Sequence, residues 1–266
     1  MKNVAGSGAK WLDVSAARFP GWIASFAVRD GIPAPAEPAG PHSAAENSLI
    51  VTCDTHYVTF TAADGAAAEC HPPFPESLAW PAAGGDGPAG GADGPAGGAD
   101  GPAGGVAPAA ITAAVAAHAT APRSVGVLLV RLGGYAAGVF AGYPPALADA
   151  KTGSRLVHGR SAAGGWSQHR FARRREKQAN EALDAAADAA VLVFGRWAAA
   201  GRERRLDTVV LGGDKRAVAE LRDDPRLAPY LAIATERFLT VPDPKRAVLE
   251  AAPKGFLAVK IRLTEP

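Results

Sequence analysis

A long helical pattern constrains the fold of this chain more than any other feature of its sequence. From Ser167 to about Ala200 there is no proline, and alanine and charged residues dominate. Residues on one side of such a helix recur at steps of three and four, as residues that pack on a core do. Those positions are Ala172, Glu176, Ala179, Leu183, Ala186, Ala190, Phe194 and Trp197. The spacing therefore predicts one long α-helix with a packed face.

A second stripe on the same stretch is basic. Its members, Arg170, Arg173, Arg174 and Lys177, lie about 140° around the helix from the packed stripe. Residues 169–177 hold four Arg and one Lys against one Glu, a local charge of +4, whereas the whole chain carries only +2. Cations at a helix N-terminus oppose the helix dipole and repel one another. A bound polyanion would relieve that cost, so the stripe favours nucleic acid over a merely solvated basic face.

Strand patterns surround this helix. Two apolar runs, 125–132 and 135–140, flank Gly133-Gly134, which predicts a β-hairpin. The other predicted elements are a strand within 146–157, a strand over 206–211, a helix over 215–222, a strand at 231–233 or 237–241, a helix over 244–251 and a strand over 256–263. Up to residue 241 the resulting order is β-β-β-α-β-α-β, which predicts an α/β sandwich with a mixed sheet and is also typical of RNase H-like folds.

Composition divides the chain into three parts. Residues 1–81 contain the strand patterns 48–53 and 56–61 and are predicted to form a small α+β N-terminal domain. Residues 82–108 repeat Gly-Gly-Ala-Asp-Gly-Pro-Ala with almost no large apolar side chain, which predicts a linker or an expanded surface loop. Residues 109–266, which begin with a short Ala-rich helical pattern, are predicted to form the α/β domain.

Features of several other protein classes are not expected. Cys53 and Cys70 lack CxxC spacing, which favours a reduced, cytoplasmic compartment over a disulfide scaffold. We recognise neither a signal peptide nor an apolar run long enough to span a membrane. His56 and His71 stand in contexts where histidines are usually structural or solvated, so we expect no metal ion and no cofactor.

The order of these features resembles one known domain. A β-hairpin, a third strand, a glycine loop ending in Gln, a long basic helix, a strand ending in Gly-Gly and a second helix resemble the catalytic middle domain of eukaryotic and archaeal class-one peptide release factors. Those carry Gly-Gly-Gln in the loop, whereas this loop reads Gly164-Gly165-Trp166-Ser167-Gln168. It is more similar to that of the bacterial VMS-like release factors (VLRF), peptidyl-tRNA hydrolases of ribosome-associated quality control. The resemblance covers roughly residues 123–242.

The resemblance implies hydrolysis of the ester between a nascent peptide and the 3′ end of tRNA. Gln168 is the implied catalytic residue: a carboxamide cannot serve as a general base, but it can hold a water molecule, and its backbone N–H can stabilise developing negative charge. The loop residues Gly164 and Gly165 permit close approach of RNA, Trp166 can stack on a base, and Ser167 completes the loop. The implied RNA contacts are His158, Arg160, His169, Arg170, Arg173, Arg174 and Lys177.

The implied partners are the rRNA of the large ribosomal subunit and peptidyl-tRNA, bound by a cytoplasmic monomer. Two alternatives stay open. One is a metal-dependent RNase H-like tRNA nuclease, for which Asp207 and Asp214 are the available carboxylates. The other is a non-catalytic ribosome- or RNA-binding module. In the plainest interpretation Gln168 only caps the helix and Trp166 only packs beneath the loop.

Overall fold

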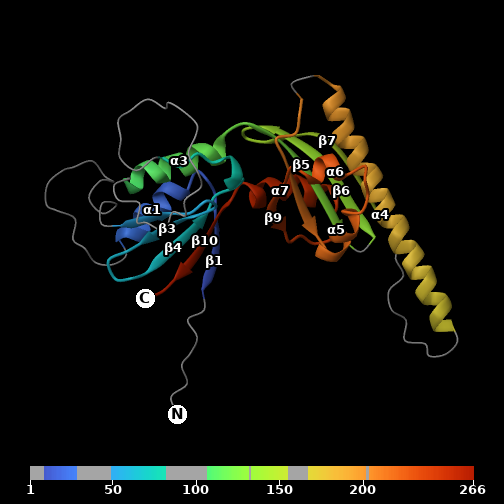
Figure 1. The fold of residues 1–266 in the computed structure, drawn as a ribbon, viewed down its shortest axis with the longest axis horizontal. Coiled ribbons are helices and arrows are strands. Elements are labelled where there is room, and N and C mark those ends of the chain that lie inside the picture. The colour runs from blue at the N-terminus through green and yellow to red at the C-terminus, as the bar shows by residue number, and fades with distance from the viewer. Residues whose placement is uncertain (1–8, 29–48, 82–106, 132, 155–166, 202–203) are drawn as a thin grey trace, which may run out of the picture. The chain divides into compact units, whose positions relative to one another are not determined.

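The computed structural model describes residues 9–28, 49–81, 107–131, 133–154, 167–201 and 204–266, and for residues 167–176 and 179 it describes the backbone. The chain forms two compact units, and most of their elements are labelled in Figure 1. The first unit consists of Met1–Thr120 and Leu257–Pro266, and the second of Ala121–Phe256. The second unit is therefore an insertion in the sequence of the first.

The first unit is built on a five-stranded antiparallel sheet with the strand order β1-β10-β4-β3-β2. The strands are β1 (Lys10–Val14), β2 (Ile50–Cys53), β3 (Val58–Thr61), β4 (Ala67–His71) and β10 (Val259–Thr264). Two helices, α1 (Phe19–Val28) and α3 (Pro108–Thr120), pack against each other, and a 3-10 turn, η1 (Pro75–Ser77), follows β4.

Alternation along these strands separates a core face from an open face. Phe60 and Ile261 are fully buried in one cluster with Ile111 of α3. The side chains that alternate with the buried ones along the strands point to the opposite face. On that face Trp11 is 56% exposed, and its cross-strand neighbour Arg262 is exposed as well. The helices of this unit thus cover one face of its sheet, as is common for antiparallel sheets.

The second unit contains a mixed five-stranded sheet with the order β7-β6-β5-β8-β9. Its strands are β5 (Arg123–Arg131), β6 (Gly134–Gly142), β7 (Ala146–Ser154), β8 (Thr208–Gly213) and β9 (Ala234–Leu239). β5, β6 and β7 form an antiparallel meander, whereas β8 and β9 run parallel to β5. The central strand β5 is buried from Val125 to Val130 because helices cover both of its faces.

Those helices are α4 (Ser167–Ala199), α5 (Lys215–Leu221), α6 (Ala228–Leu231) and α7 (Arg246–Phe256). Two glycines in the sheet show how closely α4 and α7 approach it from opposite sides. A Cβ on Gly126 would lie 3.2 Å from the ring of Phe194 in α4, and a Cβ on Gly138 would lie 2.9 Å from Leu249 in α7. The small residues let both helices pack directly on the backbone of the strands.

The α/β architecture predicted from the sequence is confirmed. The hairpin, the third strand, the long helix and the strand–helix pair β8–α5 all lie within a few residues of their predicted positions. Among the stripe residues whose side chains are described, Ala186, Ala190, Phe194 and Trp197 are buried and Leu183 is half-buried. For the first three stripe residues, Ala172, Glu176 and Ala179, the structure describes the backbone but not the side chain.

The last predicted strand, over 256–263, is present as β10, but its assignment to the α/β domain of residues 109–266 was wrong. β10 lies between β1 and β4 of the first sheet and does not close the sheet of the second unit. α3 also belongs to the first unit, so the units are not divided at the predicted boundaries of 81 and 109. The alternating burial of β10 fits any sheet with an open position, and its partners lie far away in sequence. The strand β1 was not predicted at all.

Candidate catalytic loop and basic helix

The loop that precedes α4 starts at one end of the second sheet. Ser154 ends β7 opposite Gly134, which in turn lies opposite Arg131 at the end of β5. On the other side of β5, Gly213 at the end of β8 lies opposite Val130. The carboxyl ends of β5, β7 and β8 therefore share one end of the sheet, and we call it the loop end because residues 155–166 follow β7 there.

Only part of the predicted site lies within the described residues. The loop residues Gly164, Gly165 and Trp166 and the upstream His158 and Arg160 fall outside them. Ser167, Gln168, His169, Arg170, Arg173 and Arg174 form the first turns of α4, and Lys177 is exposed one turn further on. As the second residue of the helix, Gln168 is one of the four whose backbone N–H has no acceptor within the helix. That position leaves an N–H available for a ligand or an oxyanion.

The first turns of α4 lie far from the region where the helix packs. The helix has 33 residues, a length of about 50 Å. Among its described side chains, burial begins at Ala182 and continues to Trp197. Gln168 therefore lies about 21 Å along the axis before the first buried residue. In Figure 1 the yellow N-terminal part of α4 continues beyond the strands of the sheet.

Polar contacts hold the packed half of α4 in place. Arg196 donates from Nε and Nη2 to the two carboxylate oxygens of Asp149 on β7, at 2.9 and 2.8 Å. Arg226 donates to Asp188 of α4 at 2.6 Å and to Asp224 at 2.6 Å. Hydrogen bonds from Arg226 lower the pKa of Asp224, and the same bonds raise the pKa of Arg226. Because the carboxyl pKa is lowered on folding, this contribution to stability is present at neutral pH and is lost as pH falls through that lowered pKa.

Apolar and aromatic contacts complete the support of the helix. Phe194 meets Tyr230 edge-on with ring centroids 5.1 Å apart. The guanidinium of Arg204 lies 4.9 Å from the ring centroid of Trp197, near the C-terminal end of α4. The helix is thus held along its second half, and its first turns precede the region that these contacts support.

The Gly-Gly pair at the end of β8 has a structural explanation. Gly213 has φ +103°, and a Cβ there would collide with the carbonyl oxygen of Val130. A Cβ on Gly212 would lie 2.6 Å from the carbonyl oxygen of Leu239. No side chain fits at either position, so the pair permits close packing of three strands at the loop end.

The two carboxylates considered for a metal-dependent nuclease lie apart. Asp207 precedes β8 and Asp214 follows it, which separates them by roughly 20 Å. Asp207 accepts a hydrogen bond from the Ser124 N–H at 2.7 Å. Asp214 caps α5 by accepting from the N–H groups of Arg216 and Ala217. Each carboxylate therefore has a structural role, and within the described ranges no group of three His, Cys, Asp or Glu is placed to hold a metal ion.

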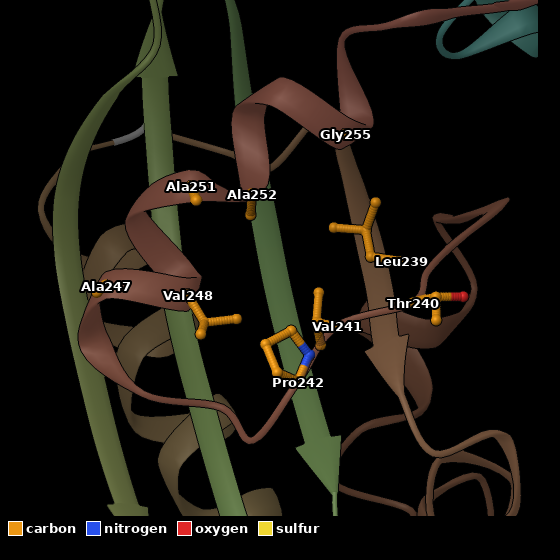
Figure 2. Close-up of a pocket in the computed structure, with 9 residues that line it drawn as sticks. All are labelled: Leu239, Thr240, Val241, Pro242, Ala247, Val248, Ala251, Ala252 and Gly255. Carbon is orange, nitrogen blue, oxygen red and sulfur yellow. The ribbon is translucent and has the colours of Figure 1, made fainter. Parts of the chain in front are cut away.

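An apolar groove of about 380 Å³ lies between α7 and the segment that follows β9 (Figure 2). Leu239, Val241 and Pro242 line one side of it, and Val248 and Ala251 of α7 line the other. The groove contains no titratable group, and the sequence did not indicate it. Its lining fixes the path of residues 240–245 across the loop end.

Other expectations concern the chain as a whole. Cys53 and Cys70 are free thiols, and burial raises the pKa of both. Among the helices of the described ranges, none is sufficiently long and apolar to cross a membrane.

Comparison with known proteins identifies the family. No curated protein matches the chain. A family model described as the Actinobacteria/chloroflexi VLRF1 release factor matches residues 123–262, which is more than half of the 266 residues. The match begins with β5, includes the loop and all of α4, and ends within β10. The chain therefore belongs to the VLRF1 release factor family.

Proposed function

We propose that this protein is a peptidyl-tRNA hydrolase that releases stalled nascent peptides from tRNA on the large ribosomal subunit, as part of ribosome-associated quality control. The observation that carries the proposal is the position of Gln168. It lies in the first turn of a helix, about 21 Å along the axis before Ala182, where burial of the described side chains begins, in a member of a release factor family. Membership of that family supports translation as the process and the ribosome as the partner.

In this proposal the reaction depends on positioning and electrostatics. The Gln168 side chain holds the attacking water near the ester carbonyl, and its backbone N–H stabilises charge on the tetrahedral intermediate or on the leaving 3′-oxygen. Gly164 and Gly165 let the RNA backbone approach, Trp166 stacks on a base, and Ser167 completes the loop. The ester oxygen of tRNA leaves with a proton, and water supplies the hydroxyl of the new peptide carboxylic acid.

The basic half of α4 binds the phosphates in this proposal. Arg170, Arg173, Arg174 and Lys177 pair with the backbone of tRNA or rRNA, with His158, Arg160 and His169 as further contacts. The binding energy of these cations orients the 3′ end at the loop without taking part in the chemistry. The protein acts as a monomer in the cytoplasm, where its ribosomal partner is found.

The separation of Asp207 and Asp214 argues against the nuclease alternative. Two-metal nucleases need carboxylates within a few ångströms of one another, and these two are roughly 20 Å apart. A binding module without catalysis is the remaining alternative, and it predicts that no residue of the loop affects chemistry.

The test is release of a labelled peptide from peptidyl-tRNA on isolated large ribosomal subunits. We expect Gln168→Ala to lower the release rate by at least about 100-fold, the scale of losing one preorganised polar group. Gln178→Ala is the matched control, because it makes the same change ten positions further along the same helix. RNA binding should be the same in both variants, since a neutral amide releases no counterions.

Other results would identify the alternatives. Release by Gln168→Ala at the wild-type rate would remove Gln168 from the mechanism. Shortened tRNA that disappears in EDTA would indicate a nuclease. Tight binding to the subunit without release by the wild-type protein would indicate a binding module.

A further inference from the structure

The loop end of the second sheet carries cations from three separate segments. The first is Arg131 at the end of β5, whose Nη1 donates to the carbonyl oxygen of Val241 at 2.9 Å. This bond draws the segment after β9 across the ends of the neighbouring strands. Pro244 then reaches β6, because a Cβ on Gly134 would lie 3.4 Å from the Pro244 Cδ.

That path places the start of α7 near the end of β7. Lys245 and Arg246 directly follow Pro244, and both are exposed. Gly134, against which Pro244 packs, is the cross-strand neighbour of Ser154, the last described residue before the loop. Adjacent strands are about 4.8 Å apart, so this pair of cations lies within a few strand spacings of Ser154.

The third segment is the start of α5. Lys215 and Arg216 follow Gly213, which lies beside Val130 at the loop end. Both side chains are exposed, and the Lys215 Nζ is 5.8 Å from the ring centroid of Phe238. These cations therefore extend the basic surface from β5 toward β9.

The loop end is positive although the chain is nearly neutral. Over residues 131, 214–216 and 243–246, five cations stand against Asp214 and Asp243, a charge of +3, and the helix residues Glu220 and Glu250 lower the local charge to +1. The cations are Arg131, Lys215, Arg216, Lys245 and Arg246. Since the whole chain carries +2 and residues 169–177 carry +4, the remaining residues, with Glu220 and Glu250 among them, carry −5 between them. Positive charge is therefore concentrated at the loop end and at the start of α4.

Within the described residues, three of these five cations form ion pairs with acids and two lysines do not. Arg216 and Arg246 are paired with Glu220 and Glu250, at 3.2 and 2.7 Å, one turn further along their helices. The Arg131 Nε is 3.8 Å from Asp243. Among the described residues, no acidic group lies within ion-pair distance of either remaining cation. Those cations are Lys215 and Lys245.

We infer that the loop end of the sheet, with Lys215 and Lys245 as its principal contacts, binds phosphates of the RNA whose 3′ end enters the loop. The inference rests on the proposed function, and it adds a contact surface at the loop end to that of the basic start of α4. A polyanion that contacts both is held by more charges than the helix alone provides, and its 3′ end is directed toward the loop.

The test compares two double variants with equal changes in charge. Lys215→Glu with Lys245→Glu reverses one cation at the start of α5 and one at the start of α7. Arg222→Glu with Lys254→Glu reverses exposed cations at the opposite ends of the same two helices. The first pair places acids in first helical turns, where they stabilise helices, so unfolding does not explain a loss of binding.

The probe is a tRNA acceptor-stem hairpin with a single-stranded 3′ end, titrated by fluorescence anisotropy at several KCl concentrations. We expect Lys215→Glu/Lys245→Glu to weaken binding at 0.1 M salt by at least about tenfold and to reduce the salt-dependence slope by about 1.5, as for the loss of two phosphate contacts. The control pair should change affinity by less than about threefold.

Three outcomes would overturn the inference. Equal weakening by both pairs would mean that only net charge matters, and no weakening by either would mean that the loop end does not contact the hairpin. Normal hairpin binding with loss of binding to ribosomal subunits would indicate an acidic protein partner. Failure of the proposed function is observed separately, as absence of peptide release by the wild-type protein.

Discussion

The helix α4 has two halves that differ in how the sequence accounts for them. From Ala182 to Trp197 a stripe of small and aromatic side chains is buried against the sheet, and Arg196 donates hydrogen bonds to Asp149 of β7. Before Ala182, the described Lys177 is exposed, and residues 169–177 carry a charge of +4. Packing explains the first set of residues. The second set has a cost in an isolated helix, and a bound polyanion would relieve that cost.

The largest expected effect comes from placing a charge in the packed half. Ala190 is fully buried, so Ala190→Asp would bury a carboxylate among apolar residues. We expect a loss of about 4 kcal/mol or more in the free energy of unfolding, measured by urea denaturation followed by circular dichroism. Ala198→Asp, on an exposed position of the same helix, should cost about 0.5 kcal/mol. Similar losses in both variants would show that the burial pattern is wrong.

A cavity in the same half should have the next largest effect. Phe194→Ala removes a ring that packs on Gly126 and meets Tyr230 edge-on. We expect a loss of about 3–5 kcal/mol by the same measurement. Leu192→Ala, at a residue that is 41% exposed, should stay within about 0.5 kcal/mol of wild type. A loss below about 1 kcal/mol for Phe194→Ala would mean that the packed half does not depend on this contact.

The ion pair that ties α4 to β7 should contribute less. The Arg196 side chain is 52% exposed and that of Asp149 is 26% exposed, so water screens the two-bond interaction. A double-mutant cycle of Arg196→Ala and Asp149→Ala should give a coupling energy of about 0.5–1 kcal/mol. A coupling energy above about 2 kcal/mol would indicate that the pair is shielded from water.

The smallest effect on stability is expected in the basic half. Arg173→Glu with Arg174→Glu replaces cations near a helix N-terminus by acids, which suits the helix dipole. The free energy of unfolding should therefore change by no more than about 0.5 kcal/mol, while affinity for the acceptor-stem hairpin falls. A large loss of stability would mean that the basic half is packed in the folded protein, and the contrast between the two halves would disappear.

Local patterns were sufficient to predict the elements of the second unit. The steps of three and four in α4, the apolar run of β5 and the turn at Gly133-Gly134 each reflect contacts made within a few residues or within one hairpin. The basic helix was recognised for the same reason. The Gly212-Gly213 pair was recognised as an end of a strand, although its tight packing on Val130 and Leu239 was visible only in three dimensions.

Contacts between residues far apart in the sequence could not be predicted from such local patterns. β10 alternates apolar and polar residues, and that pattern does not indicate which of the two sheets the strand joins. The cations Lys215 and Lys245 are 30 positions apart in the sequence and stand in unremarkable surroundings there. They belong to one surface because Arg131 and Pro244 bring the segment after β9 across the sheet. Such surfaces follow from topology rather than from a motif.

The position of β10 has a consequence for biosynthesis. β1 pairs only with β10 in its sheet, and β10 also separates β1 from β4, yet it follows the whole second unit in the chain. During translation the sheet of the first unit stays incomplete while the second unit is synthesised. A nascent chain that stalls before residue 259 would leave β1 without its partner strand. A protein of a release factor family thus has a first unit whose sheet is completed only after the second unit has been synthesised.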